Sequence, residues 1–179
     1  MSNLIISLSN GLHRIARSVA MFAVAGMFIT VMIQVVARYV FSSPPIWTED
    51  VARYMMVWTG LLGTTLSFKG RSDAVLMKSV FPPRPAFMGL VSEAIRSAAV
   101  LSFILPVIWF SFMGLRGGLA KGYLARQAGL TADTLGIAMV WIAVVVPIAM
   151  IIILIHLAAQ WAEGRAEAPD TRDAVVGLD

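Results

Sequence analysis

The sequence contains no cysteine, only two histidines and few charged residues. Asp, Glu, Lys and Arg make up 13% of the chain, against about 25% in soluble domains. The lack of cysteine excludes disulfide bonds, thiolate metal sites and cysteine nucleophiles. The HExxH, P-loop and GxSxG patterns of common enzyme sites are also missing. We therefore expect no catalytic residue, no metal centre and no cofactor.

Hydrophobic residues, in contrast, make up 59% of the chain, against about 45–50% in soluble domains. They are gathered into runs, and a helix that crosses a bilayer needs about 20 such residues. Four runs reach or approach this length and predict spans at about 18–40, 47–68, 86–115 and 134–160. The sequence therefore predicts an all-α membrane protein with one four-helix domain over residues 1–162.

The first run follows Arg14 and Arg17, an arrangement that also suits a secretory signal peptide. Its length exceeds the usual h-region of about 7–15 residues and no A-x-A site closes it, so a retained span is the favoured interpretation. Residues 2–17 place Leu and Ile on one helical face, which predicts a short helix in the membrane interface. A second interfacial helix is predicted between spans two and three, where basic and apolar residues mix.

The basic residues lie at the ends of the spans and therefore indicate topology, although a formal net charge of +4 first suggests nucleic acid as a partner. Nine of the 14 Lys and Arg residues lie before span one, between spans two and three, at the start of span three (Arg96), or after span four. The positive-inside rule then places both termini in the cytoplasm. Residues 163–179 carry five acids with few bulky apolar side chains, which predicts a disordered cytoplasmic tail.

The polar residues near and within the spans suggest one further hypothesis. His13 and His156 both lie toward the predicted cytoplasmic side, and histidines on facing membrane helices can hold haem. Two isolated histidines are more often polar residues of the interface, which is the favoured interpretation.

The hydroxyl side chains within the spans favour helix contacts over a substrate path, because Ser and Thr bond their own helix carbonyls and Gly60 and Gly63 permit close packing.

Three charges stand at the start of the second run, in the stretch WTEDVARYMMVW. Thr48 is predicted to cap a helix whose first turn holds Glu49 and Asp50, where the helix dipole favours acids. Arg53 follows these acids at spacings of four and three, which permits ion pairs on one face. Arg38 is a further candidate partner for the second acid. A self-contained helix start and a polar cluster that orients a partner protein are equally compatible with these residues.

The same residues carry a resemblance to a known family. The stretches RYVF at 38–41, WTEDVARY at 47–54 and VWTGLLG at 57–63 resemble the DctQ-like small membrane subunit of tripartite ATP-independent periplasmic (TRAP) transporters. That family pattern is close to RYxF, a short gap, W-x-E-E-x-x-R and an apolar span with a glycine. Asp50 stands in place of the second Glu, and the H-I-x-V-D pattern after span two has no counterpart in RSDAVLMKSVFP. The structural or interface residues implied are Arg38, Tyr39, Trp47, Glu49, Asp50, Arg53, Trp58 and Gly63.

The resemblance implies a permease subunit in the bacterial inner membrane rather than an enzyme. In such a transporter a periplasmic substrate-binding protein captures an organic anion, such as a carboxylate. A large membrane subunit then moves the anion with sodium, and the small subunit braces the large one. The implied partners are these two proteins and the phospholipid membrane, with no nucleic acid and no substrate site in this chain.

Two alternative functions remain from the residues themselves. The first is a self-sufficient small transporter that works as a homodimer, which would need a carboxylate embedded in the membrane as its coupling site. The second, less favoured, is a haem-bearing membrane anchor that uses His13 and His156.

Overall fold

The computed structural model describes residues 2–70, 86–114, 117–132 and 134–162, and helices joined by loops make up this part of the chain. It contains an isolated antiparallel bridge between Thr131 and Ala138 but no β-strand. The all-α prediction is therefore confirmed. The predicted interfacial helix after span two and the predicted tail lie outside the described residues. The elements are α1 (Ser2–Tyr39), α2 (Trp47–Gly70), α3 (Ala86–Phe112), η1 (Leu119–Lys121), α4 (Tyr123–Ala128), α5 (Val140–Ala143) and α6 (Val145–Ala162).

The first helix differs from the prediction because the expected interfacial helix and the first span are one element. α1 has 38 residues and is therefore about 57 Å long, well above the hydrocarbon thickness of about 30 Å. No proline interrupts Ser2–Tyr39, and one glycine near its start costs only about 1 kcal/mol. Nothing in the sequence therefore ends the helix before the SSPP stretch at residues 42–45.

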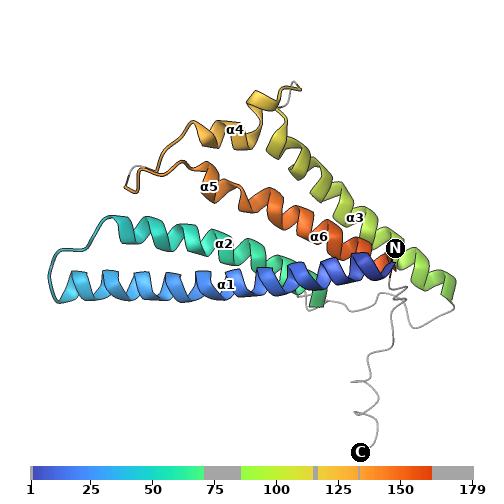
Figure 1. The fold of residues 1–179 in the computed structure, drawn as a ribbon, viewed down its shortest axis with the longest axis horizontal. Coiled ribbons are helices and arrows are strands. Elements are labelled where there is room, and N and C mark those ends of the chain that lie inside the picture. The colour runs from blue at the N-terminus through green and yellow to red at the C-terminus, as the bar shows by residue number, and fades with distance from the viewer. Residues whose placement is uncertain (1, 71–85, 115–116, 133, 163–179) are drawn as a thin grey trace, which may run out of the picture.

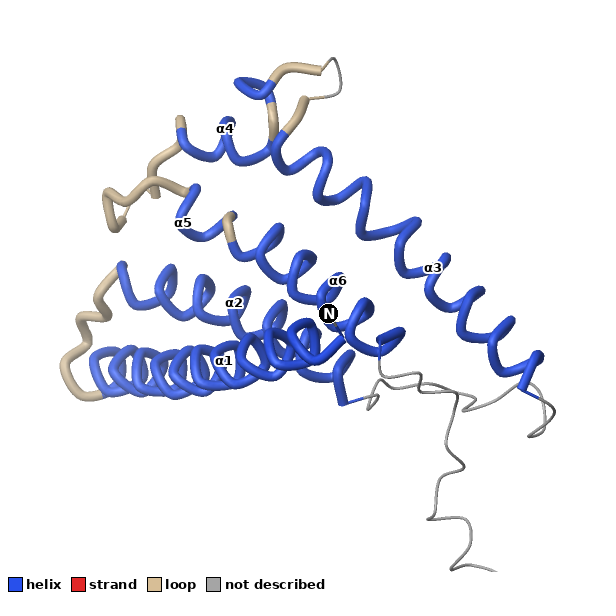
Figure 2. The backbone as a smooth tube through the Cα atoms, turned by 45° about the vertical axis from the view of Figure 1, so that its right-hand side comes forward, coloured by secondary structure: helices blue, strands red, loops and turns tan. Residues whose placement is uncertain are grey.

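The long helices form a hairpin and a central helix that covers it. α1 and α2 run antiparallel and in contact along their lengths, and α6 packs against both (Figure 1). α3 packs chiefly on α6 and diverges from it toward the end that carries α4, as both views show (Figure 2). In the most apolar part of Val140–Ala162, which contains α6, 56% of the residues are buried. The corresponding share is 11% for α1 and 17% for α3. The central position of α6 therefore leaves the outer faces of α1 and α3 uncovered.

The core consists of two clusters on different faces of α6. One joins α1, α2 and α6 through Ala16, Ala20, Leu62, Val145 and Ile152. The other joins α2, α3 and α6 through Phe68, Ile104, Met150, Ile153 and Leu157. Small residues on α1 and branched ones on α6 permit close contact in the first cluster, as is common between membrane helices.

The helix predicted from about residue 134 begins only at Val140, and it is interrupted after Ala143. Gly136 has a φ of +63°, a conformation that glycine adopts without strain. The turn around it is closed by hydrogen bonds from Ala132 N to Ile137 O and from Met139 N to Leu130 O, both 2.8 Å. The interruption between α5 and α6 fits Pro147, whose ring clashes with the carbonyl of the residue four positions earlier.

Within the described residues, three helical stretches are long and apolar enough to cross a membrane: Leu4–Tyr39, Val91–Phe112 and Val140–Ala162. α2 is about 36 Å long, but its acids, Arg53, and its Thr, Ser and Gly residues lower its hydropathy, and it is not among the three. The prediction of spans is thus confirmed for three helices. The fourth span and the side on which the termini lie stay predictions.

Candidate functional site

Three charged side chains at the start of α2 and one hydroxyl from the loop before α5 form a group that we call the outer cluster. Its members are Glu49, Asp50, Arg53 and Thr134. The Arg53 guanidinium donates to Glu49 Oε1 at 2.7 Å and lies 3.7 Å from Asp50 Oδ1. The side chains of Arg53 and Glu49 are 62% and 65% exposed, whereas that of Asp50 is 20% exposed. The predicted pairing of Arg53 with both acids is therefore present, and most of its charge faces outward.

Thr134 connects the outer cluster to the loop between α4 and α5. Its hydroxyl donates to Asp50 Oδ2, and the Tyr54 hydroxyl lies 3.8 Å from the Met139 sulfur. These contacts join residues more than 80 positions apart. These two contacts hold Thr134 and Met139 against α2, and they could not be predicted from the sequence because only the folded chain brings the two segments together.

Two predictions about the start of α2 were wrong. The Thr48 hydroxyl does not cap the helix but donates to the Pro45 carbonyl at 2.7 Å, which ties the preceding turn to the first turn of α2. The expected ion pair of Arg38 with the second acid does not form within the described part, where Asp50 is bonded to Arg53 and Thr134. Arg38 is exposed near the end of α1.

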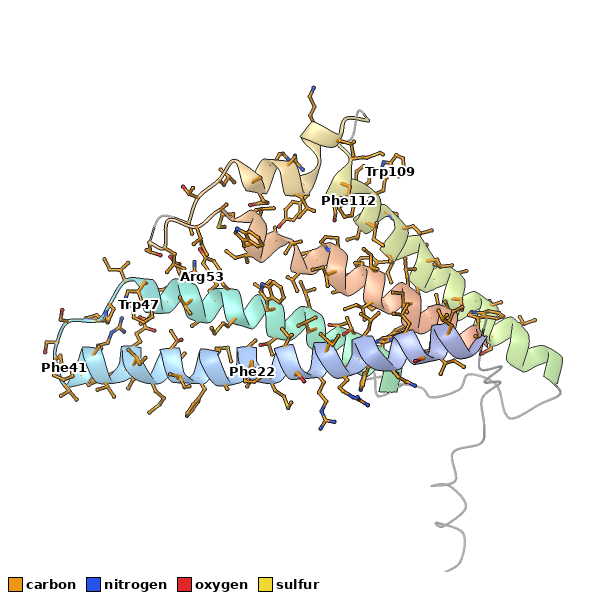
Figure 3. All side chains as sticks on the ribbon, viewed as in Figure 1. Phe22, Phe41, Trp47, Arg53, Trp109 and Phe112 are labelled. Atoms are coloured by element: carbon orange, nitrogen blue, oxygen red, sulfur yellow. The ribbon has the colours of Figure 1, made fainter. Side chains whose placement is uncertain are left out.

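The aromatic and glycine candidates divide between the surface and the core. Tyr39 and Trp47 are 80% and 43% exposed at the turn of the hairpin, whereas Trp58 packs on the first core cluster. Figure 3 shows Trp47, together with Phe41, at the end of the hairpin that also carries Arg53. A Cβ on Gly63 would meet nothing within 4 Å. The close helix contact predicted there is found instead at Gly26, where a Cβ would lie 2.7 Å from the Met55 sulfur.

The opposite end of the bundle carries a second polar group, which we call the inner junction: Ser9, Lys69, His156, Gln160 and Trp161. The Ser9 hydroxyl and His156 Nδ1 are 2.8 Å apart and both side chains are buried. Lys69 Nζ donates to the Ser9 carbonyl at 3.1 Å and to Asn10 Oδ1 at 2.6 Å. Gln160 Nε2 donates to the carbonyl of Phe68 at 3.3 Å. These bonds link α1, α2 and α6, and those of His156 and Gln160 are buried.

The inner junction extends to α3 through two further contacts. Trp161 Nε1 donates to Ser97 Oγ at 2.8 Å. The Arg96 guanidinium lies 5.7 Å from the centre of the Phe68 ring, within the range of a cation–π contact. All four long helices are therefore joined at this end by contacts between side chains far apart in the sequence.

His13 lies beside the inner junction, where its ring centroid is 6.2 Å from that of His156 in an edge-to-face arrangement. Ser9 is one helical turn from His13 and bonds directly to His156. A porphyrin between the two rings would therefore have to separate α1 from α6 at a point where the helices are in contact. The geometry favours a helix junction for this pair.

The family model of the DctQ component of tripartite ATP-independent periplasmic transporters matches residues 27–167. This match covers most of the chain. The chain belongs to the DctQ family. None of the curated proteins matches the sequence. The resemblance noted at residues 38–63 is thereby confirmed.

Membership of this family makes the chain the small permease component of a TRAP transporter, with an apolar multi-pass fold suited to the inner membrane. The DctQ component belongs to a family of transporter parts rather than of enzymes. Membership of the family also implies that the chain has a large permease component and a substrate-binding protein as partners. The matched residues include the outer cluster, and they end beyond α6.

Proposed function

We propose that this DctQ component braces the large membrane subunit of its transporter during sodium-coupled uptake of an organic anion such as a carboxylate. The observation that carries the proposal is the contrast between an inner junction whose buried side chains bond across helices and an outer cluster whose Glu49 and Arg53 are more than half exposed. The inner junction bonds helices of this chain to one another. The outer cluster is left free to orient a second protein.

The polar side chains within the described spans support a role without substrate binding. Thr30, Thr64 and Ser111 each donate to a backbone carbonyl of their own helix at 2.7–2.9 Å, as the sequence analysis predicts for residues that do not form a substrate path. In the described part, the three acids Glu49, Asp50 and Glu93 each lie within 4.0 Å of an arginine nitrogen. Selectivity and sodium binding then belong to the large subunit.

The surface that would contact the large subunit is apolar along the helices and charged at the outer end. α3 exposes Phe103 and Trp109, which are 64% and 55% accessible, and Gly63 leaves open space on α2. In a membrane such faces contact either lipid or another helix. We propose that Arg38, Tyr39 and Trp47 extend the outer cluster toward the partner, with both termini in the cytoplasm and α2 as the fourth span.

The test is to replace Glu49 and Arg53 by alanine, one at a time, and to measure both the recovery of the large subunit and uptake. We expect lower recovery or uptake, with capture of substrate by the soluble binding protein unchanged. A matched control is Glu93→Ala, which removes an acid also paired with an arginine but near the inner end. Normal assembly and full uptake in both outer variants would contradict the bracing role.

A self-sufficient homodimeric transporter is tested by reconstitution of this chain alone in vesicles with a sodium gradient. The bracing proposal predicts no uptake by the lone chain and uptake when the large subunit and binding protein are added. The haem alternative is tested by an absorbance scan of the purified chain, for which we expect no Soret band.

A further inference from the structure

An open groove of about 630 Å³ runs along the surface of α1, on the side where α1 meets α2. It is lined by six residues of α1 between Arg17 and Phe28, and by Leu66 of α2. Ala20 and Ala25 are among the lining residues, and their small side chains leave space that larger neighbours do not fill. The groove lies outside both the outer cluster and the inner junction.

The groove is chemically divided along its length. Arg17 is the charged member of the lining, and the other lining residues are apolar. Arg17 is exposed, and no hydrogen bond or ion pair joins its guanidinium to another residue of the described part. From Ser2 to Tyr39 the helix contains no Asp or Glu, so this positive charge has no neutralising acid on its own helix.

The length of the groove matches one leaflet of a bilayer. Arg17 and Phe28 are separated by a helical rise of about 16 Å, and half of the hydrocarbon thickness is about 15 Å. Arg17 therefore lies at headgroup level when Phe28, which is 64% exposed, lies near the bilayer midplane. A cation at one end and an apolar channel of this length complement an acyl chain with an anionic head.

We propose that this groove binds one anionic glycerophospholipid, with its phosphate on Arg17 and one acyl chain along Ala20, Ala25 and Phe28. A guanidinium recognises phosphate oxygens through charge-assisted hydrogen bonds. A helix of a partner protein placed in the same groove would cover Arg17 and would need to supply an acid for it. The site requires only that the chain lies in a membrane, and it is independent of the bracing role.

The test is native mass spectrometry of the purified transporter, with all its subunits, after exchange into mixed phosphatidylglycerol and phosphatidylcholine of equal chain length. We expect one phosphatidylglycerol retained per DctQ chain. Arg17→Gln should reduce that retention about fivefold, the effect of one basic residue at a membrane surface. Arg14→Gln is the matched control, because Arg14 is also exposed on α1 but does not line the groove, and it should leave retention unchanged.

A second variant tests the apolar half of the groove while the charge stays in place. Ala25→Leu should lower the retention of both lipids, because the larger side chain occupies the channel. Equal phosphatidylglycerol retention in the wild type and in Arg17→Gln would overturn the proposal, as would an equal loss in Arg14→Gln. A photo-crosslinking amino acid in place of Val24, which is 43% exposed in the groove, should label lipid, and its capture of the large subunit instead would also overturn the proposal.

Discussion

The two ends of the helix bundle use polar residues in opposite ways. At the inner junction, buried groups from separate helices bond to one another, as between Ser9 and His156 at 2.8 Å. At the outer cluster, the ion pair between Glu49 and Arg53 is exposed and lies on a single helix. Buried bonds between helices have no competing water, whereas exposed ion pairs contribute about 0–1 kcal/mol. The bonds of the inner junction therefore stabilise the chain, whereas the exposed ion pair of the outer cluster contributes little to its stability.

The largest effect is expected from His156→Ala at the inner junction. His156 is 1% exposed, so the change removes a packed ring and leaves Ser9 without its partner. We expect a loss of about 2–4 kcal/mol in the free energy of unfolding, measured by denaturant titration in detergent. Ile151→Ala on the exposed side of α6 is the control, with a loss below about 1 kcal/mol. Equal losses of unfolding free energy in His156→Ala and Ile151→Ala would contradict the stabilising role of the inner junction.

A smaller effect is expected where the outer cluster holds its loop. Thr134→Val removes the hydrogen bond to Asp50 with little change in shape, at a cost of about 1 kcal/mol. Hydrogen exchange of the amides at residues 130–139 should then become about fivefold faster. Thr131→Val is the control, because Thr131 is exposed and lies in the same loop. If exchange is as slow in Thr134→Val as in the control, Asp50 does not fix this loop.

A comparison of two glycines tests the close contact between α1 and α2. Gly63→Ala should raise the stability of the isolated chain by about 0.5–1 kcal/mol, because alanine favours a helix and a Cβ there meets nothing. Gly26→Ala should gain less, since its Cβ would lie 2.7 Å from the Met55 sulfur and that flexible side chain must move. Unfolding titrations of both variants measure the difference, and a larger gain at Gly26 would contradict it.

The smallest effect on stability is expected from Glu49→Gln. The ion pair with Arg53 is mostly exposed, so its loss should change the free energy of unfolding by less than about 0.5 kcal/mol. The same titration, repeated at high salt, should show no further change in the variant. A loss above about 1 kcal/mol would mean that the outer cluster holds this chain together.

The features that the sequence predicted are those set by neighbouring residues. The helical runs and the pairing of Arg53 with Glu49 depend on spacings of a few positions, so periodicity suffices to find them. The bond between Ser9 and His156 joins residues 147 positions apart, and depends on how α1 and α6 pack. A polar side chain at the end of an apolar helix is the only local signal for it.

Packing also explains where the sequence misled. Gly63 follows the pattern of a close helix contact, yet the contact occurs at Gly26, because the rotation of α2 decides which face meets α1. The last helix is shorter than predicted because the chain turns at Gly136 and because the Thr134 hydroxyl donates a hydrogen bond to Asp50. Hydropathy predicts neither the position of the close helix contact nor the start of the last helix.

The most direct test of the account is the recovery of the large subunit with a chain that carries both Glu49→Gln and Arg53→Gln. We expect the amount and unfolding stability of this DctQ chain to be unchanged, while the amount of large subunit that co-purifies with it falls severalfold. Recovery of the large subunit at the wild-type level, with the two charges removed, would contradict the assignment of the outer cluster to partner recognition.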